Sequence, residues 1–167
     1  LTAGKLKPFR QGSGRLELAR AMFNDGHPLV ARVIVNRIWE QHFGQGLVRT
    51  PSNFGTQGQR PSHPGLLDDL AARFVAHRWS LKWLHREITG SAAYRQSSRN
   101  RPDGRASDPD NRLLWRFTPR RLAIEPWRDA MLQVTDSLDQ RLGGAAGNLG
   151  DDSYSRRTLH GKIDRKT

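Results

Sequence analysis

The chain has 167 residues, with 28 Lys and Arg against 16 Asp and Glu, so its formal net charge is +12 at pH 7. This length and a hydrophobic content of 35% suffice for a core and exclude wholesale disorder. The chain has no Cys, which excludes disulfides, thiolate metal sites and thioether-linked haem within it, and no apolar run approaches the ~20 residues of a membrane helix.

The first residues predict a linker followed by a helix. Segment 1–14 contains several Gly and one Pro and shows no hydrophobic period, so we predict a linker there. It shows no signal-peptide pattern. Apolar residues then recur at helical spacing from Arg15, which predicts a helix that ends at the turn sequence Asn24-Asp25-Gly26.

A second helix is predicted over 28–43 and is apolar on more than one side, which is typical of a central helix with several neighbours. Arg32, Asn36 and Glu40 follow one another at four-residue spacing on one face, with Arg37 beside them. A buried arginine must be paired and hydrogen-bonded. We therefore expect these polar residues to form an internal polar core that ties a long loop to the helix.

That loop follows directly. Segment 44–62 holds four glycines and two prolines and has no convincing period. Irregular connections of this length are uncommon in compact domains and are often functional or specially fixed. Arg49 and Asn53, with Phe54, are the residues expected to anchor it to the core. A fixed Ω-like loop and a binding loop both remain open.

Two amphipathic helices are predicted next. One opens at His63-Pro64, and the other follows Ser80, which suits the N-cap position. Trp79 and Trp83 flank their junction and are expected to pack the helical hairpin.

The last part of the chain is less regular. Segment 97–111 is polar and interrupted by Pro and Gly, which predicts an exposed, mobile loop. Segment 112–117 is short and apolar, and we predict a strand or an extended segment there. A final helix is expected to run to about Leu142, with a kink or a late start caused by Pro126.

Together these patterns predict a mainly all-α fold, a compact domain of about five helices with long irregular loops. A short extended segment is expected near the C-terminus, at 158–160. The predicted domain organisation is a linker over 1–14, a helical domain over 15–142, and a flexible segment over 143–167. We expect this last segment to include the start of an incomplete C-terminal element.

Several segments resemble one known family when taken in order and with their spacing. The family is a planctomycete-type domain of unknown function, found at the C-terminal end of large exported proteins that often carry cytochrome-c-like modules. The matching segments are 31–39, 42–48, 62–67, 81–85, 91–98, 111–116 and 154–161.

This resemblance implies a multidomain, exported parent protein, periplasmic or extracellular, in which sibling domains are the partners. It implies no cofactor in this chain, because any haem would be bound by a separate cytochrome domain. It transfers no catalytic residue, because the family has no accepted catalytic assignment.

The histidines show no motif for metal binding. None belongs to an HExxH sequence or to another paired metal spacing, so we expect no metal site. The six are His27, His42, His63, His77, His85 and His160.

A hydrolase is one alternative function. There is no GxSxG sequence, so an esterase-like serine site has no support. Glycosidases need two carboxylates facing one cleft. Glu40, Glu87 and Glu125 lie in predicted helices, where salt bridges are the ordinary explanation for a carboxylate. Glu40 is the best single catalytic candidate for a carbohydrate-active hydrolase, because it lies on the central helix beside the long loop.

A polyanion-binding module is another alternative. Arginine dominates the positive charge, with 23 of the 28 cations, but is spread along the chain, which favours a generally basic surface over a nucleic-acid stripe. An acidic polysaccharide or an acidic protein is therefore a better candidate partner than nucleic acid. The candidate patch consists of Arg95, Arg99, Arg101, Arg120 and Arg121. The leading hypothesis remains an accessory or interaction domain without catalysis of its own.

Overall fold

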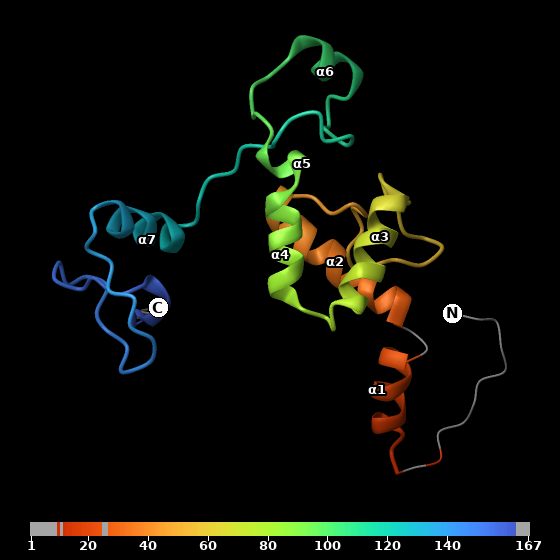
Figure 1. The fold of residues 1–167 in the computed structure, drawn as a ribbon, viewed down its shortest axis with the longest axis horizontal. Coiled ribbons are helices and arrows are strands. Elements are labelled where there is room, and N and C mark those ends of the chain that lie inside the picture. Colours follow the sequence, from red (N-terminus) through yellow and green to blue (C-terminus); the bar gives the residue numbers. More distant parts are fainter. Residues whose placement is uncertain (1–9, 11, 25–26, 163–167) are drawn as a thin grey trace. The chain divides into compact units, whose positions relative to one another are not determined.

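Helices make up the regular structure of the chain in the computed structural model, which describes residues 10, 12–24 and 27–162 (Figure 1). These residues form seven α-helices and one 3-10 turn and contain no β-strand, so the mainly all-α prediction is confirmed. Five helices have ten or more residues, in agreement with the expected number. Most of the predicted linker 1–14 lies outside the described residues. The elements are α1 (Arg15–Asn24), α2 (His27–Phe43), α3 (Pro64–Ala76), α4 (Leu81–Gly90), α5 (Ala92–Arg95), α6 (Pro102–Ser107), α7 (Ile124–Val134) and the 3-10 turn η1 (Thr158–His160).

The chain divides into two compact units, Leu1–Pro119 and Arg120–Thr167. The first contains α1 to α6, and the second contains α7 and η1. The helical domain predicted over 15–142 spans this division, and its limits stay a prediction. The predicted segment 143–167 is described as far as residue 162, and its last five residues lie outside the described part.

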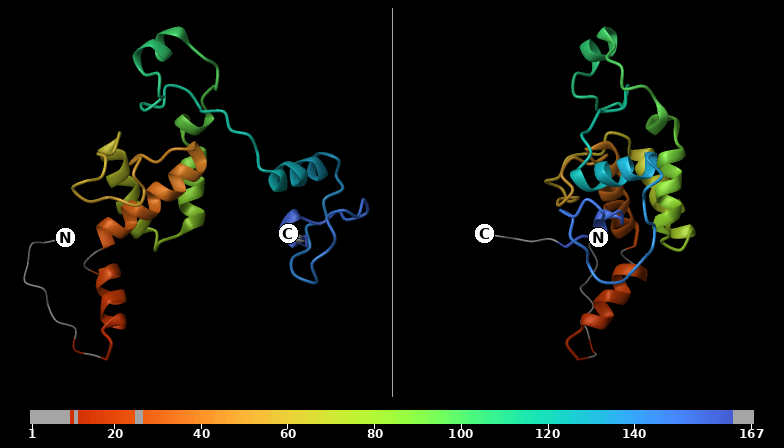
Figure 2. Two further views of the ribbon diagram at one scale, coloured as in Figure 1. Left: turned by 180° about the vertical axis from the view of Figure 1, so that it is seen from behind. Right: turned by 90° about the vertical axis from the view of Figure 1, so that its left-hand side faces the viewer.

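Helix α2 lies at the centre of the first unit and packs against α1, α3 and α4 (Figures 1 and 2). Its apolar residues face several directions, and this allows one helix to serve three neighbours. The core it organises also includes residues of the loop that follows α2. The buried apolar residues are Ala31, Val35, Trp39 and Phe43 from α2, Leu47 and Val48 from the loop, Leu67, Leu70, Ala71 and Phe74 from α3, and Leu84 and Ile88 from α4.

The turn between α3 and α4 forms as its sequence predicts. The Ser80 hydroxyl accepts a hydrogen bond from the Trp83 N–H at 3.3 Å, so the predicted N-cap of α4 is confirmed. Arg78 and Trp79 reverse the chain in left-handed conformations, with φ of 54° and 59°. The Trp79 ring packs edge-on against Phe74 at 5.3 Å between centroids, which holds this strained turn on the core.

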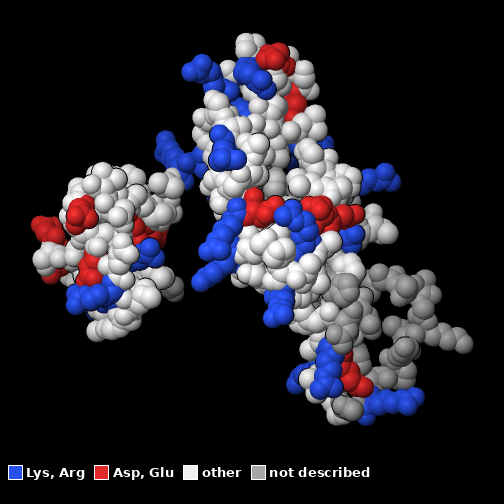
Figure 3. Space-filling model, in the orientation of Figure 1, with Lys and Arg blue, Asp and Glu red and all other residues white. Residues whose placement is uncertain are grey.

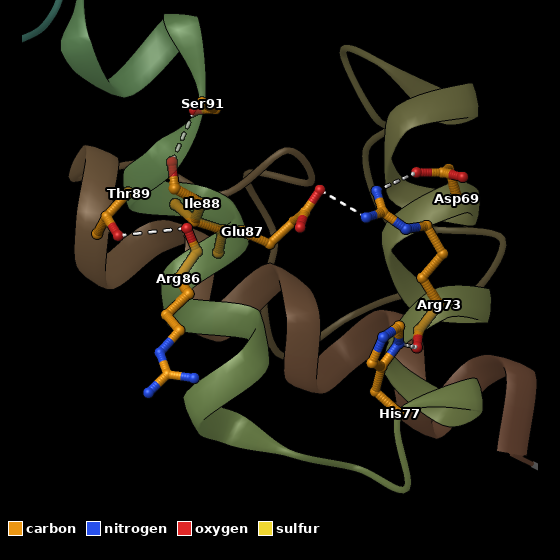
Figure 4. Close-up of polar contacts among 8 residues, drawn as sticks. All are labelled: Asp69, Arg73, His77, Arg86, Glu87, Ile88, Thr89 and Ser91. Atoms are coloured by element: carbon orange, nitrogen blue, oxygen red, sulfur yellow. Dashed lines mark hydrogen bonds and ion pairs between the residues drawn. The ribbon is translucent and has the colours of Figure 1, made fainter.

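Polar contacts join the outer faces of α3 and α4 (Figure 4). The Arg73 guanidinium binds Glu87 at 2.6 Å and Asp69 at 3.3 Å, so one cation bridges both helices. The Trp83 ring stacks on His77 at 4.2 Å between centroids and lies under Arg73 at 5.1 Å. Glu87 thus forms the salt bridge that its helical context predicted.

Segment 112–117 is neither a strand nor extended, and that prediction is wrong. The Asp108 carboxylate accepts hydrogen bonds from two successive N–H groups, those of Arg112 at 2.9 Å and Leu113 at 2.7 Å, and so fixes a turn. Leu114 has a φ of 56°, which no strand residue adopts. The preceding region, predicted to be one mobile loop, contains the short helix α6.

Helix α7 in the second unit is shorter than predicted, ending at Val134 rather than near Leu142. The Ser137 N–H closes the helix end by donating to the Leu132 carbonyl at 2.9 Å, and Asp136 has a φ of 55°. Thr, Asp and Ser side chains compete for backbone hydrogen-bonding groups and favour helix ends. Residues 135–137 are Thr, Asp and Ser and therefore signal the end of the helix, but the prediction followed the apolar spacing beyond them.

Pro126 neither kinks α7 nor delays its start, contrary to expectation. The helix begins at Ile124, so Pro126 lies in the first turn. The N–H groups of the first turn have no acceptor within the helix, and the N–H that proline lacks therefore costs nothing there.

The closing segment of the second unit folds back onto α7. The Arg128 guanidinium donates to the carbonyls of Tyr154 and Arg156, the latter at 3.0 Å. Residues 158–160, expected to extend, form the turn η1 instead, because Asp129 binds both the N–H and the hydroxyl of Thr158. Within the described residues, extended pairing is limited to two isolated bridges, Asp139 with Arg156 and Gly147 with Gly161.

Candidate functional site: an arginine-lined pocket

A buried asparagine holds the long loop against α2. The Asn36 side chain is fully buried, with 0% of its surface exposed. Its amide N–H donates to the Val48 carbonyl at 2.9 Å, and its carbonyl accepts from the Val48 N–H at 2.8 Å. Gly46 passes so close that a Cβ there would lie 2.6 Å from the Asn36 amide nitrogen. Position 46, two residues before Val48, therefore has to be a glycine for the loop to lie this close to Asn36.

Further hydrogen bonds fix the loop along its length. The Arg49 guanidinium donates to the Asp110 carbonyl at 3.2 Å and lies 3.6 Å from its carboxylate. Asn53 is exposed and shapes the loop locally, because its side-chain oxygen accepts from the Gly55 N–H at 3.0 Å. The Ser62 N–H closes the loop by donating to the Leu47 carbonyl at 2.9 Å.

The loop and segment 110–118 enclose a pocket next to the C-terminal end of α2. It has a volume of about 460 Å³, counting the part open to solvent. Three arginines and one carboxylate line it, so its lining is electropositive. The lining residues are Trp39, Phe43, Gln45, Gly46, Leu47, Arg49, Arg60, Ser62, Asp110, Asn111, Arg112, Leu114 and Thr118.

The other polar residues of α2 do not reach this pocket. Arg32 is not buried as expected: 36% of its side chain is exposed, and its Nε donates to Asp68 at 2.6 Å. This hydrogen bond holds the pKa of Asp68 below the usual 3.8. Arg37 is exposed and Glu40 is half-buried, and neither belongs to the pocket lining.

Two histidines meet at the surface between α2 and α4. His42 Nε2 and His85 Nδ1 are 2.8 Å apart, within hydrogen-bonding distance. The edge of the Tyr94 ring packs against His42, with 5.6 Å between centroids. Among the residues that the structure describes, no three His, Asp or Glu side chains are grouped so that they could hold a metal ion.

The predicted polyanion patch is divided between the two units. Arg95, Arg99 and Arg101 are exposed in the first unit, where Arg101 donates to the Trp115 carbonyl at 3.1 Å. Arg120 and Arg121 are exposed in the second unit. Figure 3 shows blue Lys and Arg side chains at many separate places on one face, with red acidic side chains between some of them.

Residues 14–165 match the family model PSD1, described as a protein of unknown function (DUF1553). The chain belongs to this family. No curated protein and no solved structure matches the chain significantly. Within the described part of this PSD1 domain, no helix is both long and apolar enough to cross a membrane.

The sequence predicts parts of both walls of the pocket. Arg49 and the loop 44–62 were predicted to matter, and both line the site. Arg60, which lies in the same loop, and Asp110 were not predicted as site residues. Arg112 begins segment 112–121, whose four arginines mark it as a place to look for a polyanion site, and it also lies in segment 111–116, one of the segments that carry the family resemblance.

Proposed function

We propose that this PSD1 domain is an accessory interaction domain of a larger exported protein, with no catalysis of its own. Its partners are sibling domains of the same protein, of the planctomycete type that carries cytochrome-c-like modules. The parent protein is periplasmic or extracellular, and any haem is bound by another of its domains.

The outer face of α7 is the observation that supports this proposal. Ile124, Trp127, Met131 and Val134 follow one another at helical spacing and form one stripe. Their exposed fractions are 65%, 51%, 53% and 86%. A contiguous apolar stripe that is exposed along one helix is typical of an interaction surface.

The opposite side of α7 is already occupied within its own unit. Arg128 and Asp129 hold the closing segment there. The helix is therefore fixed by one side and offers the other to a partner. An apolar face suits a constant neighbour in the same polypeptide, because a permanent interface excludes water more completely than a transient one.

Amide hydrogen exchange of α7 tests this proposal in the full-length protein and in the isolated chain. We expect the amides of α7 to exchange more slowly in the full-length protein, because a sibling domain covers the stripe. Trp127→Ser combined with Met131→Ser should remove the additional protection. Gln133→Ser on the same helix is the matched control and should leave it unchanged.

Two results would contradict the proposal. One is equal protection of α7 in the isolated chain and in the full-length protein. The other is an equal effect of the apolar and the control substitutions.

A further inference from the structure

The pocket beside α2 contains cations that the fold itself does not use. Within the described residues, the guanidinium groups of Arg60 and Arg112 form no hydrogen bond and no ion pair, although both residues line the pocket. Arg49, by contrast, is bound to Asp110. Each free guanidinium offers five N–H donors in a planar fork that matches a carboxylate.

The pocket walls are held in place before any ligand arrives. On one side, the Asn36 amide and the Ser62–Leu47 hydrogen bond fix the loop. On the other side, the Asn111 side chain donates to the Arg116 carbonyl at 2.9 Å and to the Thr118 hydroxyl at 3.0 Å. A site whose walls are already ordered loses less entropy when it binds.

The remaining lining indicates what the rest of the ligand looks like. Gln45 and Asp110 supply an amide and a carboxylate, which bind hydroxyl groups. The Asp110 charge disfavours a ligand with several negative charges. The rings of Trp39 and Phe43, stacked at 4.2 Å between centroids, also line the pocket, but only 3% and 4% of their surfaces are exposed.

We propose that this pocket binds a small sugar acid, with the carboxylate held by Arg60 and Arg112. The hydroxyl groups of the sugar ring bind Asp110 and Gln45. The pocket shares no residue with the apolar stripe of α7 or with the patch at Arg95, so the proposal stands whether or not those residues bind a partner.

Calorimetric titration of the chain with D-glucuronate tests the proposal. D-Glucose lacks the carboxylate, acetate lacks the hydroxylated ring, and sulfate is an oxyanion without a ring. We expect saturable binding of glucuronate and at least tenfold weaker binding of the other three, because each lacks one half of the contacts. Added salt should weaken the binding of glucuronate.

Arg60→Gln and Arg112→Gln should each weaken glucuronate binding about tenfold, since each removes charge-assisted hydrogen bonds. Arg86→Gln is the matched control: Arg86 is exposed on α4 outside the pocket, and its loss should leave binding unchanged. Both pocket arginines are exposed, so the variants should fold, and unchanged melting temperatures would verify this.

Shifts of backbone amide resonances in the wild-type chain provide a second measurement that needs no variant. Glucuronate should shift the amides around Gln45, Arg60 and Arg112. The proposal would be overturned by shifts elsewhere, by no saturable binding, by equal binding of glucose or sulfate, or by an equal loss in Arg86→Gln.

Discussion

One carboxylate oxygen of Asp129 accepts two hydrogen bonds from Thr158, from its N–H at 2.8 Å and from its hydroxyl at 2.7 Å. Asp129 lies on α7 and Thr158 begins η1, so this pair joins the two ordered elements of the second unit. The second unit has little apolar core, and among its described residues, 120–162, Thr158 is the only one that is buried. Its stability therefore depends on polar contacts such as this one.

Thr158→Val should lower the free energy of unfolding of the second unit by about 1–2 kcal/mol. The substitution keeps the shape of the side chain but removes a hydrogen bond to a charged acceptor. Faster amide exchange in residues 154–160 would report the change. Thr56→Val is the control, because Thr56 is exposed in the long loop and should have almost no effect. An unchanged exchange rate at 154–160 would contradict the prediction.

Acid should open the closing segment of the second unit. Burial raises the pKa of Asp129, but the hydrogen bonds from Thr158 and the nearby charges of Arg128 and Arg157 outweigh it and hold the pKa below 3.8. A carboxylate with a lowered pKa stabilises the folded state above its ordinary pKa, and this contribution is lost as the pH falls through the folded-state value. Chemical shifts of Thr158 should therefore change below about pH 4. Asp129→Asn should remove this acid-dependent change, and its persistence in the variant would count against the assignment.

The helices of the first unit were predictable because their period and end signals agree. The stripe at Leu67, Leu70 and Phe74 is buried as its spacing requires, and Ser80 caps α4. The end of α7 was missed because apolar residues continue at helical spacing beyond Val134, where the chain has already turned.

The pocket was beyond the reach of sequence reasoning for a different reason. Arg60 lies in the long loop and Arg112 follows α6, and only the tertiary fold brings them into one lining. Periodicity describes neighbours along one element. It carries no information on which loops meet.

Asn36→Leu should be the most damaging single change in the first unit. The substitution removes both hydrogen bonds between residue 36 and Val48. The backbone N–H and carbonyl of Val48 are then buried without partners, which costs about 2–5 kcal/mol. Thermal unfolding measured by circular dichroism would show the loss. Arg37→Ala, at the exposed neighbouring position, should change stability by less than about 0.5 kcal/mol. Equal melting temperatures for the two variants would refute the role of the clamp.

Two glycine substitutions should have opposite signs. Gly46→Ala places a Cβ 2.6 Å from the Val48 carbonyl oxygen, so we expect a loss of about 1–3 kcal/mol as the clamp is forced apart. Gly65→Ala lies near the start of α3 with open space around it and should raise stability by up to about 1 kcal/mol. Chemical denaturation of both variants checks this. Destabilisation by Gly65→Ala, or none by Gly46→Ala, would contradict the described geometry.

Arg32→Ala should have a small effect despite its position on the central helix. Arg32 forms an ion pair with Asp68, and 56% of the Asp68 side chain is exposed to solvent. Pairs of this kind contribute about 0.2–1 kcal/mol and weaken with salt. Denaturation at low and high salt would measure the contribution. A loss well above 1 kcal/mol that is independent of salt would show that Arg32 stabilises the fold in another way.

The position of the core along the chain also affects the order of folding. Among the described residues, every buried apolar residue of the core lies between Ala31 and Ile88, and the helices that carry most of them are consecutive. Chains whose contacts are local in sequence fold quickly, and N-terminal regions emerge first during synthesis. The central helices of the first unit can thus begin to pack together before the residues that form α7 and η1 emerge from the ribosome.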